Sequence, residues 1–330
     1  MLRLKMKPDA LADYIKRDTN WMKDVGWLKD PVVHEAFKLI RQEFMQKPVP
    51  YDITREGAGV VMAGGRHYDA GIYVGIRMLR HVGCKLPVEV WHKGENEWVS
   101  DSVRELPGVE VKDLLTQGPP ARFRGGYQNK MDSILASKWR QIIFFDADVY
   151  PVVDPTYLLY LTGIGGLILW PDLPSTGGAL CYESYGIDPR DQIEAVNGGH
   201  HVWQFPQAWR VLQLANHFDD YPEYYYQHHK GVGGFGDQDQ LRAAIKLLRH
   251  PYLMFSRDPG FKPGCFVQSG VDAKPLWVHR CKSKFGPKKY WDDRHCATYR
   301  PDLPCEDLVW KFYRKWQKLN PDSVKEKTNY

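Results

Sequence analysis

The apolar positions of the first 50 residues recur at the three- and four-residue spacing of an amphipathic helix. This spacing predicts an N-terminal helical cap over residues 1–50, which ends at the proline-containing segment 47–52. The apolar side chains that set the spacing are Leu11, Tyr14, Ile15, Val33, Ala36, Phe37, Ile40 and Phe44.

Between residues 57 and 155, short apolar runs alternate with segments of helical periodicity. Residues 57–65 have the pattern of a buried strand that ends in a glycine turn, and residues 69–83 continue with helical spacing and a terminal glycine. This order predicts an α/β fold with a doubly wound, mostly parallel sheet that binds ligands at the carboxyl ends of its strands. Further strands are predicted at 86–92, 107–114 and 140–155, and a further helix at 125–139.

After residue 155 the alternation is less regular. An apolar run at 166–172, a glycine-containing run at 194–205 and a helix from about residue 206 to 218 precede a tyrosine- and glycine-rich loop that opens another helix. We interpret residues 51–155 and residues 156–330 as two halves of one continuous domain.

Composition narrows the class of protein. Hydrophobic residues make up 43% of the 330 residues and charged residues 26%, which are values typical of globular proteins and exclude a disordered chain or a coiled coil. An aromatic fraction of 13% suits stacking against sugars or bases, and it equally suits an aromatic-rich core.

The formal net charge is +5, and the excess of cations is greatest in the C-terminal part. These cations could attract the phosphates of a nucleotide, a nucleic acid or a lipid head group, whereas a solvated helix face is the simpler interpretation for the last lysines. The cations of this part include Lys282, Lys284, Lys288, Lys289, Arg294, Arg300, Lys311, Arg314, Lys315 and Lys318.

The six cysteines form no CxxC pair, which argues against a structural zinc site. The first residues contain no apolar segment of the kind found in secretory leaders, so we expect free thiols and a cytoplasmic protein. No apolar run approaches the roughly 20 residues that a membrane span needs, and we therefore expect none.

The strongest chemical signal is a pair of aspartates where an apolar strand ends. Asp146 and Asp148 follow the run 142–145 and precede a proline turn. Two residues apart on an extended chain, both carboxylates point to the same side. Oxygen ligands of this kind hold Mn²⁺ or Mg²⁺, and such ions commonly keep substrate phosphates as further ligands. A pair of surface aspartates in a turn is the alternative.

A glycine turn between the first strand and its helix is a second, weaker signal. Backbone N–H groups in such a turn form an anion site, so we expect Ala63, Gly64, Gly65 and Tyr68 to face the donor. A tight turn with no ligand is at least as consistent with these residues.

Taken in order, these motifs resemble a known family. The runs 59–80, 86–92, 125–137 and 142–159, followed by 194–218 and 224–245, are similar to the fungal Golgi α-mannosyltransferases that branch mannan. A more distant likeness connects the chain with the retaining family-8 transferases that include glycogenin. The resemblance covers roughly residues 57 to 285. It implies a GT-A type of α/β fold in which residues 51–155 form the nucleotide-sugar-binding half and residues 156–330 the acceptor-side half.

The resemblance also implies roles for individual residues. Asp146 and Asp148 correspond to the metal-binding DxD motif, and His279 stands where family-8 enzymes place a third metal ligand. The glycine that usually separates this histidine from the phosphate-binding lysine is absent. Asp237, Gln238 and Asp239 match the element beside the anomeric carbon, although a DQD triplet also caps helices well. Donor-binding roles fall on Gln128, Lys130, Lys282 and Lys284.

We therefore expect a metal-dependent glycosyltransferase that moves a sugar from a UDP- or GDP-sugar to an acceptor hydroxyl, with retention of configuration. The acceptor would be a glycan, a protein or a modified base in DNA, and we interpret His200, His201, His228 and His229 as loop residues that could line its site. The family's enzymes are membrane-anchored, which contrasts with the cytoplasmic expectation. The alternatives are a metal-dependent phosphodiesterase and a non-catalytic module that binds glycans or nucleic acid.

Overall fold

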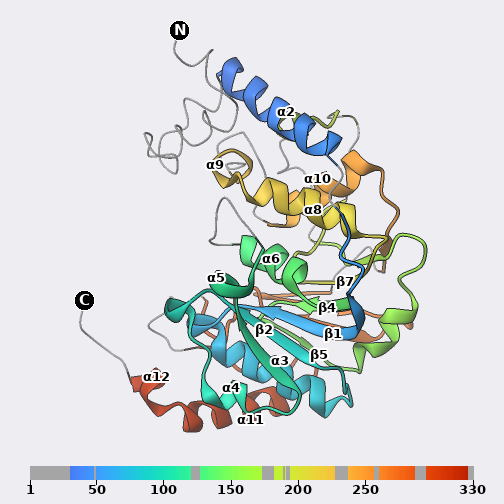
Figure 1. Ribbon diagram of the computed structural model, residues 1–330. Helices are drawn as coiled ribbons and strands as arrows, with labels where there is room; N and C mark the ends of the chain where they lie inside the picture. Colours follow the sequence, from blue (N-terminus) through green and yellow to red (C-terminus); the bar gives the residue numbers. More distant parts are fainter. Residues whose placement is uncertain are drawn as a thin grey trace.

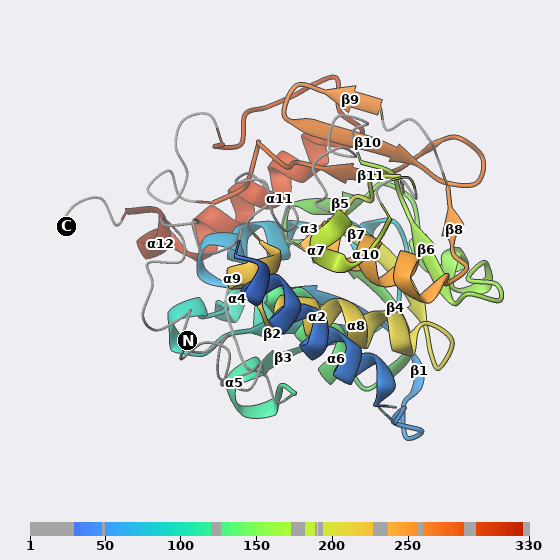
Figure 2. The same cartoon turned by 90° about the horizontal axis from the view of Figure 1, so that it is seen from above.

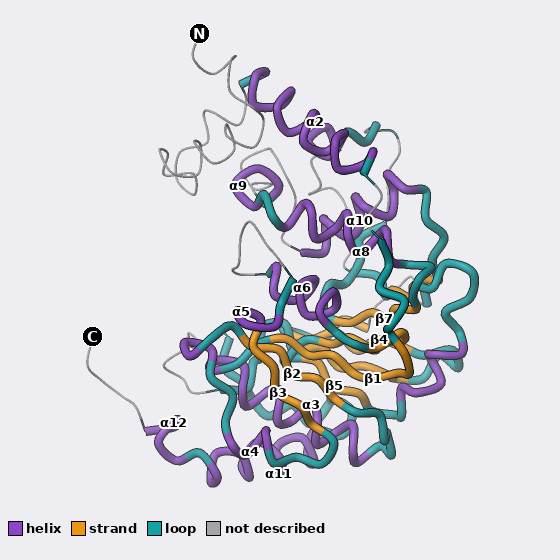
Figure 3. The backbone as a smooth tube through the Cα atoms, viewed as in Figure 1, coloured by secondary structure: helices purple, strands orange, loops and turns teal. Residues whose placement is uncertain are grey.

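The protein has an α/β architecture in which a central sheet lies between two layers of helices (Figures 1 and 3). The predicted α/β class is confirmed. The computed structural model describes residues 30–47, 50–119, 127–172, 182–188, 190, 194–226, 237–255, 260–286 and 295–325.

The main sheet has seven strands in the order β3-β2-β1-β4-β7-β6-β8. Strands β3, β2, β1 and β4 are parallel, and β7 pairs antiparallel with both β4 and β6. The sheet is thus mostly parallel, as predicted, and it takes strands from both sides of residue 155. The strands are β1 (Glu56–Ala63), β2 (Val88–His92), β3 (Val109–Asp113), β4 (Trp139–Phe145), β6 (Leu167–Leu169), β7 (His200–Gln204) and β8 (Leu253–Met254).

Both faces of this sheet are buried because each central strand is apolar on both sides. In β4, Ile142 and Phe144 pack against one layer of helices, whereas Ile143 and Phe145 pack against the other. The first layer contains α2 (Pro31–Gln46), α6 (Gln128–Ala136), α8 (Trp209–Asp219), α9 (Pro222–Tyr225) and α10 (Asp237–Leu248). The second contains α3 (Asp69–His81) and α11 (Glu306–Leu319), with α4 (Asp101–Arg104) beside them (Figure 1).

A smaller antiparallel sheet lies beside α11 (Figure 2). Its strands follow the order β5-β11-β10-β9, and β5 begins directly after the turn that ends β4. The small sheet therefore connects the C-terminal part of the chain to the central strand of the main sheet. Its strands are β5 (Val149–Pro151), β9 (Gly260–Lys262), β10 (Cys265–Ser269) and β11 (Pro275–His279); the remaining helices are α5 (Leu114–Gln117), α7 (Tyr182–Tyr185) and α12 (Pro321–Lys325).

The N-terminal helical cap is seen as α2, which packs its apolar side on α8 and α7, while residues 1–29 lie outside the described part. Asp30 caps this helix by accepting a hydrogen bond from the Val32 N–H (2.9 Å). Among the described residues, no helix combines the length and apolar character that a membrane crossing requires. The described cysteines are free, and Cys181 lies outside the described part.

Candidate active site

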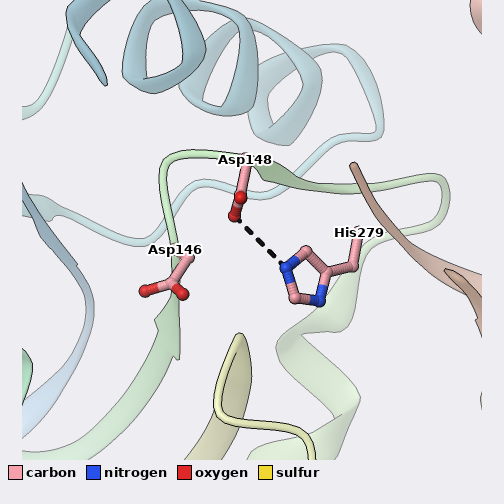
Figure 4. Close-up of side chains that lie close together, drawn as sticks. All are labelled: Asp146, Asp148 and His279. Atoms are coloured by element: carbon pink, nitrogen blue, oxygen red, sulfur yellow. Dashed lines mark ion pairs between the residues drawn. The ribbon is translucent and has the colours of Figure 1, made fainter. Parts of the chain in front are cut away.

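Two aspartates lie in the turn that leaves the central strand of the main sheet. β4 ends at Phe145, and Asp146, Ala147 and Asp148 form the turn into β5. The Asp146 N–H donates to the carbonyl oxygen of Gly199 (2.7 Å), which ties this turn to the start of β7. The predicted extended conformation is therefore replaced by a turn, and the two carboxylates still converge (Figure 4).

A glycine on α3 allows the helix to approach this turn. A Cβ atom at Gly71 would lie 2.0 Å from the carbonyl oxygen of Ala147, so a larger residue would force the backbone to move. The first turn of α3 therefore packs directly on the aspartate turn and fixes its position.

His279 brings a third ligand from the small sheet. It ends β11, and the antiparallel pairing with β5 places it opposite Val149, next to the aspartate turn. Its Nε2 lies 3.4 Å from Asp148 Oδ1 (Figure 4), and single ligand atoms of Asp146, Asp148 and His279 all lie within 4.8 Å of one another. The structure thus brings the three predicted metal ligands together.

These three side chains fit a divalent cation. Asp148 Oδ1 is buried and receives no hydrogen bond from any described residue. His279 Nδ1 lies 3.1 Å from Asn197 Oδ1, which leaves the Nε2 lone pair facing Asp148. Two acceptors that face each other need a cation between them. Two carboxylates with an imidazole suit Mn²⁺ better than Mg²⁺, because Mg²⁺ prefers oxygen ligands and water.

Two lysines neutralise the aspartates. Lys130 Nζ lies 2.6 Å from Asp146 Oδ2, and Lys284 pairs with Asp148 Oδ2. Lys130 comes from α6, and Lys284 from the segment that follows β11. Cations from two distant parts of the chain therefore lie beside the carboxylates, where they can also reach the phosphates of a ligand.

Charge around Asp148 sets the protonation of the site. Burial alone would raise the pKa of Asp148, but the charge of Lys284 and the contact with His279 outweigh burial and hold this pKa well below its usual range. Burial lowers the pKa of Lys284, yet Asp148 and Tyr68 more than compensate, so its pKa is raised. At neutral pH the carboxylate is therefore ionised and the lysine is charged.

A cavity of about 420 Å³ opens beside the three ligands. It combines backbone at the end of β1 with aromatic, amide and charged side chains from α6 and from the loops after β2, β4 and β11. The residues that line it are Ala63, Gly64, Tyr68, Glu97, Tyr127, Asn129, Lys130, Asp146, Ala147, Asp148 and Lys284.

The glycine turn contributes to this cavity in a way that differs from the prediction. Ala63, Gly64 and Tyr68 line it, but the Gly64 N–H donates to the carbonyl of Trp91 (2.8 Å), so this N–H forms no anion site. Gly65 lies outside the lining. A Cβ atom there would lie 1.9 Å from the carbonyl oxygen of Glu97, so this glycine allows the loop after β2 to approach.

Two further donor-binding predictions are corrected. Gln128 is fully buried and donates from Nε2 to Asp220 Oδ1 (2.8 Å), so it faces the α8 layer. It precedes Lys130 by two residues and therefore points to another side of α6. Lys282 is exposed and lies outside the cavity lining, which leaves Lys284 as the lysine of this segment that reaches the site.

The DQD element at the start of α10 is only partly in position for the predicted role. The Asp237 side chain lies outside the described part. With its amide nitrogen turned toward them, Gln238 donates to Asp172 Oδ2 (2.8 Å) and to the carbonyl of Val196 (3.3 Å), one residue before Asn197. Asp239 is fully buried and pairs with Arg242 (2.7 Å), so its carboxylate has no surface for a sugar to contact.

Besides Ala147, which lies between the two aspartates, three residues that line the cavity were not predicted from the sequence. Tyr127 and Asn129 lie within the segment whose Lys130 was predicted, and their closeness to this lysine along the chain was the available signal. Glu97 lies in an irregular loop where no motif marks it. Burial raises the pKa of Glu97 above its ordinary value.

His200 and His201, expected as loop residues near the acceptor, lie instead within β7 and are buried. Burial holds the pKa of His200 well below its usual range and lowers that of His201 to about 3, so both rings are neutral. His201 Nδ1 accepts a hydrogen bond from Trp203 Nε1 (2.6 Å). His228 and His229, expected in the same role, lie outside the described part.

Other cations of the C-terminal part lie on α11, away from the site. Lys311, Arg314, Lys315 and Lys318 line a second cavity of about 390 Å³ together with Phe312 and with Arg77 of α3. Lys288, Lys289 and Arg294 lie outside the described part, and Arg300 pairs with Asp302 (3.0 Å). Attraction of phosphates by this surface stays a prediction.

Residues 57–233 match Mannosyl_trans3, a family described as mannosyltransferases. The chain is also 25% identical over 331 residues to the α-1,2-mannosyltransferase MNN2 of Candida albicans, which covers 83% of this chain and 53% of that protein. It is 27% identical over 250 residues to MNN24 of the same organism, which covers 62% and 35% respectively. The chain thus spans about half, or less, of the length of these relatives.

Among solved structures, the glycosyltransferase GlyE of Streptococcus pneumoniae TIGR4 is similar to the chain. The superposition has a TM-score of 0.48 and 17% sequence identity, and it covers 83% of this chain and 66% of GlyE.

Proposed function

The chain belongs to the Mannosyl_trans3 family of mannosyltransferases, and from this premise we propose that it transfers mannose from a nucleotide-sugar donor to a hydroxyl group of a glycan. The observation that carries the proposal is the meeting of Asp146, Asp148 and His279 beside a cavity that presents Lys130 and Lys284. Ligands for a cation next to cations for phosphate are what a nucleoside diphosphate requires. The arrangement supports the GT-A type of fold expected from the sequence.

Different residues of the cavity would bind different parts of the donor. Asp146, Asp148 and His279 would hold a divalent cation, with Mn²⁺ preferred, and this ion would supply positive charge against the diphosphate leaving group. Lys130 and Lys284 bind diphosphate oxygens from positions beside the same carboxylates. Tyr68 and Tyr127 offer aromatic surfaces for the flat parts of the donor.

The bond changes are those of glycosyl transfer. The bond between the anomeric carbon and the diphosphate oxygen breaks, the acceptor oxygen bonds to that carbon, and the acceptor proton passes to a phosphate oxygen. We propose retention of configuration because the sequence resembles retaining family-8 transferases. NMR of the transfer product measures this, and an inverted anomer contradicts it.

The cavity wall favours guanine as the base of the donor. Glu97 presents a carboxylate, and the buried Asn129 presents an Oδ1 that receives no hydrogen bond from any described residue. Guanine offers two adjacent donors, N1–H and the N2 amino group, to such acceptors, whereas uracil offers a single N–H between two carbonyls. Together with the cations that can bind a diphosphate, these acceptors suit GDP-mannose.

The test of this base assignment is Glu97→Gln, measured as GDP and UDP affinity by calorimetry with Mn²⁺. Loss of a charge-assisted hydrogen bond should weaken GDP binding about 10- to 100-fold and leave the weaker UDP binding unchanged. The matched control is Glu95→Gln, an exposed carboxylate on the same loop. Equal GDP affinity in wild type and Glu97→Gln would remove the guanine assignment.

The function itself is tested by incubating the protein with Mn²⁺ and GDP-mannose, UDP-glucose or UDP-galactose, with and without mannose oligosaccharides. We expect metal-dependent GDP release that is accelerated by the oligosaccharide. Cleavage of phosphodiesters in place of sugar donors would support the phosphodiesterase, which needs more carboxylates than the one cluster found among the described residues. Binding of glycan without turnover would support the non-catalytic module.

A further inference from the structure

Residues 197–199 form a turn that contacts Asp146, Lys130 and His279 of the candidate active site. The Gly199 carbonyl accepts the Asp146 N–H (2.7 Å), and the Gly198 carbonyl lies 3.4 Å from Lys130 Nζ. Asn197 Oδ1 lies 3.1 Å from His279 Nδ1. The turn immediately precedes β7, which pairs with β4, so the main sheet fixes it in place.

The hydrogen bonds of Asn197 determine which nitrogen of His279 carries a proton. The Gly199 N–H donates to Asn197 Oδ1 (2.8 Å), which shows that the amide oxygen, and not the amide nitrogen, faces the turn. The same oxygen faces His279 Nδ1, so this ring nitrogen must be the donor. The lone pair of Nε2 then points toward Asp148, at 3.4 Å from Oδ1.

Close packing of the turn against the imidazole ring also restricts the position of His279. A Cβ atom at Gly199 would lie 2.7 Å from His279 Cε1 and 2.9 Å from Asn197 Oδ1. Glycine at this position therefore allows the imidazole to lie close against the turn. Asn197 is almost fully buried, so water does not compete for its amide oxygen.

We propose that Asn197 is a positioning residue for metal binding, which holds His279 with Nδ1 protonated so that Nε2 coordinates the cation. The inference rests on the proposed function, because it assumes that His279 is a metal ligand. A partner that holds the second nitrogen of a metal-bound histidine fixes the orientation of the ring and increases its basicity.

The test compares Mn²⁺ affinity, measured by EPR titration, in wild type, Asn197→Leu and Asn197→Asp. Asn197→Leu removes the acceptor at similar volume and should weaken Mn²⁺ binding about 10- to 100-fold, whereas Asn197→Asp keeps an acceptor oxygen and should bind within about threefold of wild type. Thermal unfolding without metal confirms that each variant folds. If Asn197→Leu does not fold, Asn197→Ala, which also lacks an acceptor, replaces it with the same expectation.

A double-mutant cycle separates positioning from a merely structural role. In a His279→Ala background, Asn197→Leu should cause no further loss of Mn²⁺ affinity, because the ring that it orients is absent. An equal loss in both backgrounds, or none in the wild-type background, overturns the proposal while the metal site stands. A wild-type protein that binds no Mn²⁺ overturns the metal site of the proposed function and this inference with it.

Discussion

His217 lies buried on α8, where its ring stacks on Phe44 at a centroid distance of 4.2 Å. Burial lowers the pKa of His217 to about 3 from an ordinary value of 6.5. Between these two values the unfolded chain binds a proton that the folded protein does not bind. Protonation of His217 in the unfolded chain therefore does not reduce the free energy of unfolding above pH 6.5. It reduces this free energy progressively as the pH falls from 6.5 toward 3.

The substitution His217→Phe preserves a stacked ring and removes the titrating group. When the pH is lowered from about 7.5 to 5, we expect the free energy of unfolding of the wild type to fall by about 2 kcal/mol more than that of the variant. This difference follows from the linkage between proton binding and folding. Urea unfolding at the two pH values measures the difference. His81→Phe, at an exposed position, is the control. An identical pH dependence in wild type and His217→Phe would contradict the assigned direction.

The identity of the charged ligands could be predicted from the sequence, whereas the direction of several side chains could not. Asp146 and Asp148 stand out because carboxylates follow an apolar strand, and this position survives the change from extended chain to turn. Gln128 was misplaced because a motif does not give the rotational phase of its helix. Glu97 and Asn197 act through contacts with distant residues, which no local pattern records.

Among the elements, α3 is the one that holds the aspartate turn most directly. Gly71 on this helix faces the carbonyl oxygen of Ala147 at 2.0 Å from an added Cβ. At Gly75, one turn later, the nearest atoms are side-chain ends of Phe145 and Met62, and the nearest backbone atom, the Val149 oxygen, lies at 3.3 Å. Backbone cannot move away as easily as side chains can. The two glycines therefore differ in what a methyl group would displace, although both lie in the same helix.

We compare Gly71→Ala with Gly75→Ala. The higher helix propensity of alanine should by itself raise the free energy of unfolding of both variants by up to about 1 kcal/mol. A Cβ at Gly71 lies 2.0 Å from backbone, against a closest contact of 3.1 Å at Gly75. Gly71→Ala should lose about 1–3 kcal/mol net and weaken Mn²⁺ binding, whereas Gly75→Ala should change stability less and leave Mn²⁺ binding intact. Chemical denaturation measures the stability of the two variants, and Mn²⁺ titration measures their metal affinity. Equal Mn²⁺ affinity in both variants would show that α3 does not position the turn.

Most elements of the main sheet were predictable because their strands are apolar and their helices are periodic. β7 was missed at its first two residues, since Gly198, Gly199 and two histidines suggested a loop. The hydrogen bonds of His200 and His201 to β4 decide their conformation, and this pairing joins segments more than 50 residues apart.

At the scale of the whole molecule, a buried ion pair joins the last long helix to the active-site sheet. Arg280 follows His279, and its guanidinium makes two contacts of 2.8 and 2.9 Å with the carboxylate of Glu306 at the start of α11. Both side chains are almost completely buried. The pair therefore connects the C-terminal helix to the strand that carries the histidine ligand.

Glu306→Gln removes the negative charge and leaves the buried guanidinium without a counter-ion. We expect the free energy of unfolding to fall by about 3–5 kcal/mol. Asp307→Asn, at the next and exposed position, should change it by about 1 kcal/mol or less. Denaturant unfolding of both variants is the measurement. A Glu306→Gln protein as stable as wild type would mean that the pair does not hold α11 in place.

The overall architecture was predictable only for the main sheet. The small sheet depends on β5, which has three residues, and on its pairing with β11, which lies more than 120 residues later. No periodicity in so short a strand indicates its partner. The likeness to the family-8 transferases placed His279 at the site, and the pairing explains physically how it arrives there. A cytoplasmic location and a protein or DNA acceptor stay predictions.

The account depends most on a metal held by the aspartate pair. The most direct measurement is calorimetric titration of GDP with and without Mn²⁺, alongside mannosyl transfer, in wild type and in the Asp146→Asn, Asp148→Asn double variant. Wild type should bind GDP tightly only with Mn²⁺, and the double variant should lose this dependence and transfer about 1,000-fold more slowly, which corresponds to about 4 kcal/mol. Metal-dependent GDP binding and transfer that persist in the double variant would contradict the account.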